Sequence, residues 1–351
     1  MNYQEYVPGL VVWELTLKCN LKCLHCGSSA GRARDNELST EEGLKLCDDL
    51  AKLGFKGITL FGGEPFLRKD WPILGKRIKD LGLKLSVVSN GFVNPKKIVA
   101  ALSKLEVDSV QVGLDGTSPQ THDYIRGVDG SFEKSLGFLR SLKEADLSVG
   151  AITTVSKMNF KELPKIRDLI IKEGIDWQIQ EAAPIGRFPK KMTLSEREYY
   201  SMGLFIASNR ERYSSEKIFI AGPHNLGFHS KFIPSLGSSI EWDGCWAGKM
   251  VLGIQSDGGV KGCLALSDDF IEGNIRERSI VDIWNDPDAF AYNRKFKEED
   301  LGPNCMGCKY GETCNGGCST RSYSMTGVLH NDRYCFYRIE RELFNKTGKI
   351  E

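Results

Sequence analysis

The stretch Lys18-Cys19-Asn20-Leu21-Lys22-Cys23-Leu24-His25-Cys26 follows an apolar run and places three thiols within eight positions. Iron–sulfur clusters normally take four cysteines, so a loop offering three either recruits a distant fourth or leaves one iron open to a small molecule. A disulfide is disfavoured because the first residues lack the basic and apolar regions of a signal peptide. Zinc is the other alternative, since His25 could complete a four-ligand set, but His25 adjoins Cys26 and adjacent side chains point apart.

The following residues alternate short apolar runs with amphipathic segments. Six runs predict strands, at 10–17, 57–61, 83–88, 107–112, 147–154 and 175–180. The segments between them predict helices: one from the capping box Ser39–Glu42 to Gly54, then others at 70–81, 96–105, 131–145, 160–173 and 193–213. This alternation indicates a parallel sheet covered by helices, either an open doubly wound sheet or a partial barrel of six (β/α) units. In both architectures the functional residues lie at the C-terminal ends of the strands.

The cysteine loop, with a strand before it and a ring residue before its last thiol, resembles the cluster loop of the radical S-adenosylmethionine (SAM) enzymes. In that family the open iron binds the amino and carboxylate groups of SAM. One electron then splits SAM into methionine and a 5′-deoxyadenosyl radical, which takes a hydrogen atom from the substrate. The resemblance implies an α/β fold with a partial (β/α)6 TIM-like barrel, and a SAM-binding [4Fe–4S] cluster on Cys19, Cys23 and Cys26.

The same resemblance assigns SAM contacts to the loops after the strands. Gly-Gly-Glu-Pro at 62–65 matches the motif that accepts the SAM amino group, and Ser-Asn-Gly at 89–91 matches the ribose loop. Many relatives carry a carboxylate-binding Ser where this chain has Gly113, so the guanidinium of Arg126 is expected to bind that carboxylate instead. The loop at 181–187 resembles the family's closing loop near adenine. The expected cofactor-binding residues are Gly62, Gly63, Glu64, Pro65, Ser89, Asn90, Asp115, Arg126 and Glu181.

Seven more cysteines follow a Gly/Pro/Ser-rich passage at 221–239: Cys245, Cys263, Cys305, Cys308, Cys314, Cys318 and Cys335. The central Cys-x2-Cys-x5-Cys-x3-Cys spacing, rich in glycine, favours an iron–sulfur core over a zinc ribbon, which would need shorter repeated pairs. The whole pattern resembles the SPASM domain of radical SAM enzymes. We therefore expect a barrel domain at 8–235 and a SPASM domain at 240–345.

The SPASM resemblance implies two auxiliary [4Fe–4S] clusters, and hence three clusters in all. One would use Cys305, Cys308, Cys314 and Cys335. The other would use Cys245, Cys263 and Cys318 and would lack a fourth cysteine, so its remaining ligand is open or non-cysteine, with Asp257, Asp268 and Asp269 as candidates. Asp268 and Asp269 also follow Cys263 where some relatives carry a catalytic Asp, although a surface pair is an equal alternative.

Composition limits the partners. Lys and Arg total 47 against 46 Asp and Glu, which gives no electrostatic footprint for nucleic acid or an anionic membrane. The absence of any apolar run of about 18 residues argues against a membrane span and, without a signal peptide, for a cytoplasmic enzyme. The resemblance implies a flavodoxin- or ferredoxin-type electron donor.

The substrate is less well defined by the sequence. Many SPASM relatives form thioether or carbon–carbon crosslinks in ribosomally synthesised peptides, which is the first expectation here. Others oxidise a sulfatase residue to formylglycine or act on tetrapyrrole or aminoglycoside precursors. An electron carrier with several clusters and a zinc-stabilised structural protein are hypotheses from other classes, and neither explains the Gly-Gly-Glu-Pro and Ser-Asn-Gly loops.

Overall fold

The computed structural model describes residues 6–213, 218–223, 225–233 and 243–345. Its centre is a sheet with the strand order β10-β9-β8-β1-β2-β3-β4-β5-β6-β7. The six predicted strands are β1 (Leu10–Thr16), β2 (Gly57–Gly62), β3 (Lys84–Ser89), β4 (Ser109–Gly113), β5 (Val149–Val155) and β6 (Asp176–Glu181). Each of these strands pairs in parallel with the next, which confirms the α/β fold and the partial barrel.

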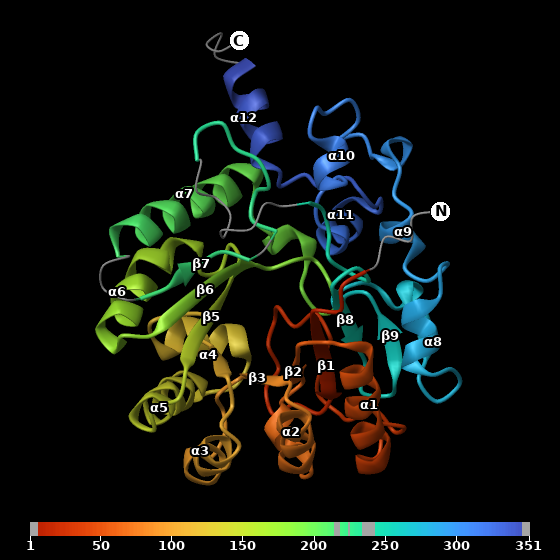
Figure 1. Ribbon diagram of the computed structural model, residues 1–351. Coiled ribbons are helices and arrows are strands. Elements are labelled where there is room, and N and C mark those ends of the chain that lie inside the picture. The colour runs from red at the N-terminus through yellow and green to blue at the C-terminus, as the bar shows by residue number, and fades with distance from the viewer. Residues whose placement is uncertain (1–5, 214–217, 224, 234–242, 346–351) are drawn as a thin grey trace.

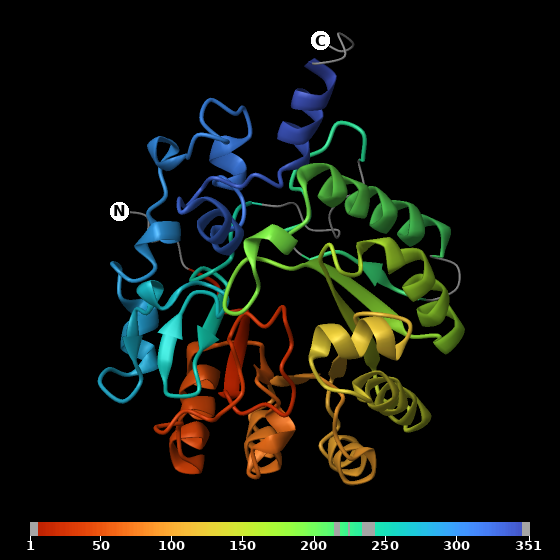
Figure 2. The same cartoon turned by 180° about the vertical axis from the view of Figure 1, so that it is seen from behind.

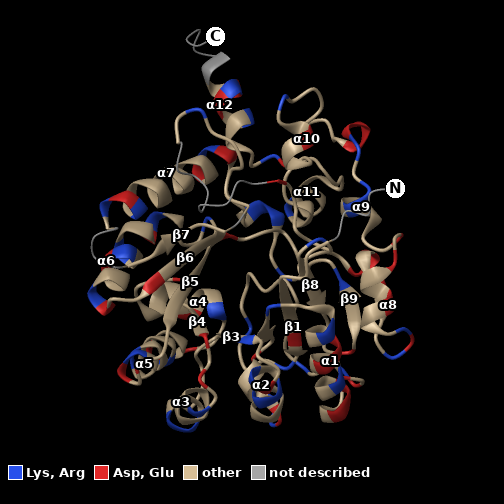
Figure 3. Ribbon diagram, viewed as in Figure 1, with Lys and Arg blue, Asp and Glu red and all other residues tan. Residues whose placement is uncertain are grey.

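Helices connect these strands and cover the sheet. They are α1 (Thr40–Leu53), α2 (Trp71–Asp80), α3 (Pro95–Lys104), α4 (Pro119–Arg126), α5 (Ser131–Glu144), α6 (Leu163–Glu173) and α7 (Glu196–Arg212). Figures 1 and 2 show most of them ranged along the outer side of the sheet. Alternate side chains of β1, namely Val11, Trp13 and Leu15, are fully buried in the core that also holds the apolar faces of α1 and α2. Acidic and basic residues are interspersed along the exposed helical surfaces (Figure 3).

Two parts of the fold differ from the sequence prediction. Residues 119–126 form the helix α4, where only a loop was expected, although Pro119 at its start and Gly127 at its end are ordinary helix boundary signals. The sheet also continues beyond six strands, through β7 (Ile220–Ala221), β8 (Val251–Ile254), β9 (Gly259–Lys261) and β10 (Gly273–Asn274). Strand β8 pairs in parallel with β1, with Leu10 opposite Val251. The predicted boundary between 235 and 240 lies outside the described residues.

The C-terminal segment contacts helices near both ends of the barrel sheet. It carries α8 (Ile280–Asn285), α9 (Ala291–Arg294), α10 (Gly311–Cys314), α11 (Ser319–Thr326) and α12 (Phe336–Asn345). Helix α8 packs against α1, and α12 packs against α7. The segment therefore contacts the barrel on the β1 side and on the β6 side. Within the described part of the chain, no helix is both long and apolar enough to cross a membrane.

Candidate functional site

The cysteine loop leaves the C-terminal end of β1 and closes on itself. The amide of Cys19 donates to the carbonyl of Gly31 (2.9 Å), and the amide of Gly31 donates to Leu17 (3.0 Å). Backbone N–H groups also point at two of the thiols, from Leu21 to Cys19 Sγ (3.4 Å) and from Ala30 to Cys26 Sγ (3.3 Å). All three thiols are partly exposed. Partial exposure with N–H donors suits sulfur atoms that carry negative charge as metal ligands.

Arg187, in the loop after β6, fixes this cysteine loop from the other side of the barrel. Its amide donates to the carbonyl of Cys26 (3.1 Å), and its guanidinium donates to the carbonyls of Cys23 (3.2 Å) and Ala30 (2.9 Å). The preceding Gly186 has φ +59°, and a Cβ there would lie 2.3 Å from the carbonyl oxygen of Gly27. The sequence analysis placed this loop near adenine and missed its support of the cluster loop.

The Gly-Gly-Glu-Pro motif packs directly beneath the cysteine loop. The amide of Gly63 donates to Thr16 and that of Glu64 to Lys18, both at 2.8 Å. A Cβ on Gly63 would lie 2.2 Å from the carbonyl oxygen of Lys18, so only glycine permits this approach. Gly62 and Gly63 stay partly exposed, and Pro65 begins a short 3₁₀ turn. The backbone of the two glycines is therefore the accessible part of the motif.

The carboxylate of Glu64 faces inward and ties the end of β2 to the end of β3. It is fully buried and accepts hydrogen bonds from the amide of Asn90 (2.8 Å) and the hydroxyl of Ser89 (3.0 Å). Burial raises the pKa of Glu64 to about 7, partly opposed by these hydrogen bonds. Asn90 in turn donates to Asn20 Oδ1 (2.8 Å) and Cys19 Sγ (3.5 Å). Ser89, Asn90 and Glu64 thus form one buried support under the thiols.

A buried charge cluster lies at the end of β4. Arg126 Nε donates to Asp115 Oδ2 (2.7 Å), and His25 Nε2 lies 3.2 Å from the same oxygen. Burial alone would raise the pKa of Asp115, but the charges of Arg126 and His25 outweigh it and hold that pKa well below its usual range. Arg126 also interacts with the thiol of Cys23. Asp115 and Arg126 therefore lie together beside the cluster loop, which agrees with their prediction as residues of one SAM-binding site.

Arg126 also explains the departure from the family pattern at Gly113. A Cβ on Gly113 would lie 2.1 Å from Arg126 Nη2, so the guanidinium occupies the space that a Ser side chain would need. The glycine and the arginine are thus matched to one another. Contact of Arg126 with the SAM carboxylate stays a prediction.

Glu181 lies apart from this group, at the contact between the barrel and the C-terminal segment. Its Oε1 accepts from Arg321 Nη1 (2.8 Å), and Arg321, in α11, is almost fully buried. Arg321 also binds Asp332, with Nη2 2.7 Å from Oδ2, and the hydroxyl of Tyr199 (2.7 Å). This network could not be predicted from the sequence, because its members share no motif. A contact of Glu181 with adenine stays a prediction.

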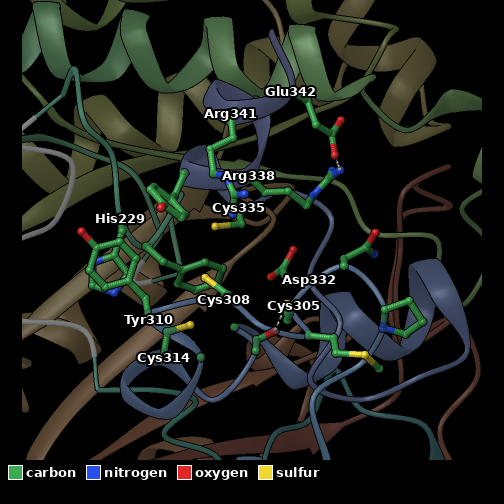
Figure 4. Close-up of a pocket in the computed structure, with 18 residues that line it drawn as sticks. His229, Cys305, Cys308, Tyr310, Cys314, Asp332, Cys335, Arg338, Arg341 and Glu342 are labelled. Atoms are coloured by element: carbon green, nitrogen blue, oxygen red, sulfur yellow. Dashed lines mark hydrogen bonds and ion pairs between the residues drawn. The ribbon is translucent and has the colours of Figure 1, made fainter. Parts of the chain in front are cut away.

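Four C-terminal thiols line one cavity of about 270 Å³, shown in Figure 4. They belong to Cys305, Cys308, Cys314 and Cys335, the four that the sequence analysis grouped. Burial, reinforced by the neighbouring thiols, raises the pKa of Cys305 and Cys335 to about 12 and that of Cys314 to about 11. A cavity walled by four thiols fits a cube-shaped iron–sulfur cluster, which would displace the thiol protons on binding.

The second auxiliary set is Cys245, Cys263 and Cys318. Burial raises the pKa of Cys263 and of Cys318, and the thiol of Cys245 raises both further, which places the three near one another. Among the residues that the structure describes, no three His, Cys, Asp or Glu side chains converge to hold a single metal ion.

The three aspartates predicted near this set have other partners. Asp268 Oδ1 accepts from Lys261 Nζ (3.0 Å) and Gln255 Nε2 (2.7 Å), and its side chain is 67% exposed. Asp269 Oδ2 accepts from the hydroxyl of Ser267 (2.8 Å) at an exposed position. Asp257 lies in the turn between β8 and β9, at the end of the hairpin away from Cys263. Their roles as ligands, or of Asp268 and Asp269 in catalysis, stay predictions.

Comparison with known proteins agrees with this geometry. The radical SAM superfamily model matches residues 13–170, and the model of the SPASM iron–sulfur cluster-binding domain matches 245–309. The AdoMet-dependent heme synthase of Methanosarcina barkeri is 31% identical over 344 residues, covering 94% of this chain and 97% of that protein. This chain belongs to the radical SAM superfamily. It is a radical SAM/SPASM enzyme, and the family binds SAM and iron–sulfur clusters.

Two further radical SAM proteins are similar over most of the chain. The mycofactocin maturase MftC of Mycolicibacterium smegmatis is 27% identical, covering 92% of this chain and 80% of that protein. The crystal structure of Streptococcus suis SuiB bound to S-adenosylmethionine superposes with a TM-score of 0.76 at 18% identity, covering 94% of this chain and 77% of that one. At this identity SuiB supports the fold alone.

Proposed function

We propose that this radical SAM/SPASM enzyme acts on an iron tetrapyrrole that carries carboxylate side chains. The observation that carries the proposal is the match to a heme synthase over nearly the full length of both chains. The matched stretch covers 94% of this chain and 97% of that protein, so it supports a common activity for the whole chain.

The cysteine sets of this chain suit the groups that this reaction needs. Cys19, Cys23 and Cys26 would hold the SAM-binding cluster, and the two C-terminal cysteine sets would hold two auxiliary clusters. When bound, these groups supply the carbon radical that removes hydrogen and an acceptor for one electron. Arg187 and Asn90 hold the cluster loop in place, and the buried Asp115–Arg126 pair sets the charge beside Cys23.

Charge around the cluster loop supports an anionic substrate. Lys18 and Lys22 are exposed there, and neither forms an ion pair with a carboxylate of the described residues. Unpaired cations beside an active site attract carboxylates and raise their local concentration. A tetrapyrrole with several carboxyethyl groups has that charge.

In the proposed reaction a carboxyethyl side chain becomes a vinyl group. One hydrogen atom leaves the carbon next to the ring, the bond to the carboxylate breaks to release carbon dioxide, and a carbon–carbon double bond forms. One electron remains and leaves the substrate, so a one-electron acceptor is required. A cytoplasmic flavodoxin or ferredoxin is the proposed reductant for SAM cleavage.

Peptide modification is the second candidate. The similarity to mycofactocin maturase over 92% of the chain favours it. The same thiols and the same SAM site would serve, and the substrate would be a ribosomally synthesised peptide.

The test is direct incubation of the anaerobically reconstituted enzyme with SAM, dithionite and iron coproporphyrin. The expected result is a product that has lost carbon dioxide and two hydrogen atoms per converted side chain, with 5′-deoxyadenosine formed alongside it. Formation of 5′-deoxyadenosine with the porphyrin unchanged would overturn the tetrapyrrole assignment and favour the peptide candidate.

A further inference from the structure

The cysteines leave one iron of the proposed second auxiliary cluster without a thiolate ligand. Cys245, Cys263 and Cys318 provide three thiolates, and a cube-shaped cluster has four irons. The best-placed carboxylate in sequence, Asp268, is mostly exposed and already bound to Lys261 and Gln255. Asp268 is therefore poorly suited to bind the fourth iron, and another side chain near these thiols is the better candidate.

The hydroxyl of Tyr292 is buried beside this set with no hydrogen-bond partner among the described residues. A Cβ built on Gly262 would lie 2.2 Å from this hydroxyl, so the phenol packs against the residue directly before Cys263. The same Cβ would lie 2.9 Å from backbone atoms of Ala247 and Gly248, so the hydroxyl also lies beside the loop that follows Cys245. Burial raises the pKa of Tyr292, and the thiols of Cys245 and Cys263 raise it further. A buried hydroxyl without a partner destabilises the folded chain and calls for an explanation.

Neighbouring contacts hold this phenol in position. The ring of Phe270 packs edge-on against it, with centroids 5.3 Å apart. The carbonyl of Tyr292 accepts a hydrogen bond from His330 Nε2 (2.7 Å). The next residue, Asn293, donates to the carbonyls of Cys245 (2.6 Å) and Ala247 (2.7 Å). Helix α9 thus fixes Tyr292 and the Cys245 loop to one another.

We propose that the phenol oxygen of Tyr292 is the fourth protein ligand of the auxiliary cluster on Cys245, Cys263 and Cys318. This inference rests on the proposed presence of that cluster. Tyrosine oxygen is an established ligand of protein-bound iron. On ligation the phenol O–H bond breaks, its proton leaves to solvent, and an iron–oxygen bond forms.

The Tyr292 hydroxyl donates no hydrogen bond to a thiol of the described residues. A phenol that served only to stabilise a thiolate would donate to it directly.

Ser319 is the alternative donor. Its hydroxyl is also buried without a partner among the described side chains, and it adjoins Cys318 in α11. Serine oxygen would give no aromatic vibrational signature, so spectroscopy separates the two residues.

The test compares reconstituted wild type with Tyr292→Phe, which removes only the hydroxyl. Wild type is expected to show tyrosinate vibrations in resonance Raman spectra excited within the iron charge-transfer band, and the variant is expected to lose them. The variant is also expected to lose about one iron per chain and to show the electron paramagnetic resonance signal of a three-iron cluster after mild oxidation. Tyr323→Phe is the matched control, because Tyr323 packs edge-on against the same Phe270 ring, and it should keep the wild-type spectrum.

Stability of the two forms gives an independent readout. In the apoprotein the hydroxyl is an unsatisfied buried group, so Tyr292→Phe should unfold at the same temperature as wild type or higher. In the loaded protein the variant should unfold at a lower temperature. If the wild type holds about twelve irons per chain but shows no tyrosinate bands, the cluster is present and the ligand assignment is wrong. About eight irons in wild type would overturn both.

Discussion

The cysteine loop after β1 and the cysteine cavity of the C-terminal segment hold thiols in different ways. The three cysteines of the loop are partly exposed, and the ends of β2, β3 and β6 support them. Of the four cavity cysteines, Cys305 and Cys314 are buried and the other two are partly exposed. Asn315, Gly316 and Gly317, all at positive φ, follow Cys314 directly. A site that must meet SAM needs an open face on a rigid support, whereas an electron acceptor needs insulation.

The largest expected effect follows from removing the open site. The triple substitution of Cys19, Cys23 and Cys26 by Ala should reduce 5′-deoxyadenosine formation to the background level, because no other thiols stand at the barrel mouth. The auxiliary irons should remain, at about eight per chain. Iron analysis and chromatography of the nucleoside measure both quantities. Persistent cleavage of SAM would contradict the assignment of the SAM-cleaving cluster to these three cysteines.

Cys314→Ala tests the insulated site in the same assay. Loss of one thiol from the cavity should abolish product while SAM cleavage without product continues, since the two sites are separate. The measurement is the ratio of product to 5′-deoxyadenosine. Loss of both activities would show that the cavity is needed for folding rather than for electron transfer.

The buried Asp115–Arg126 pair should make a large contribution to stability. Arg126→Met leaves the carboxylate of Asp115 buried without that guanidinium and should cost about 3 to 5 kcal/mol of unfolding free energy. Adding Asp115→Asn to the same chain should restore much of this loss, because the unpaired charge is gone. Denaturant titrations of both variants measure the difference, and equal stability of the two would contradict the charge argument.

Glu64 should give the stability a pH dependence of opposite sign to that of an ordinary carboxylate. Its pKa is about 7 in the folded protein against 4.5 ordinarily, so the folded state binds the proton more tightly. Stability should therefore fall as pH rises from about 4.5 to about 7, by at most about 3 kcal/mol. Glu64→Gln should flatten this part of the profile, and an unchanged slope in the variant would exclude Glu64 as its source.

The smallest expected effect concerns the substrate. Lys22→Glu should raise the KM for iron coproporphyrin about 3- to 10-fold at low salt, and the difference from wild type should shrink as salt is added. Steady-state kinetics at two ionic strengths measure it. A salt-independent KM difference would mean that Lys22 acts through loop structure rather than through its charge.

The sequence predicted the local features of the fold well. All six strands were placed to within two residues, because short apolar runs and capping boxes are local signals. The pairing of β8 with β1 could not be predicted, since it joins segments more than 230 residues apart and β8 itself is only four residues long. Helix α4 was missed because its buried residues are mostly polar, namely His122, Asp123 and Arg126 beside Ile125, so it lacks an apolar periodicity.

For the candidate site, the sequence predicted the residues that belong to motifs and not those that support them. The SPASM resemblance grouped Cys305, Cys308, Cys314 and Cys335, and these four residues line one cavity. Their role as ligands of one cluster stays a prediction. Arg187, Arg321 and Tyr292 were missed because each acts through a contact between distant segments. Glu64 was placed in the right motif, but its inward orientation follows only from the packing of β2 against β3.

We propose that the protein carries one open cluster on the barrel and two auxiliary clusters in the C-terminal segment. The most direct test of this proposal is iron and acid-labile sulfide per chain after anaerobic reconstitution, read together with 5′-deoxyadenosine formed under dithionite. We expect about twelve irons per chain, because each of the three thiol sets would hold a cluster of four irons, and we expect SAM to be cleaved. Bound zinc in place of iron, or about twelve irons without any cleavage of SAM, would contradict it.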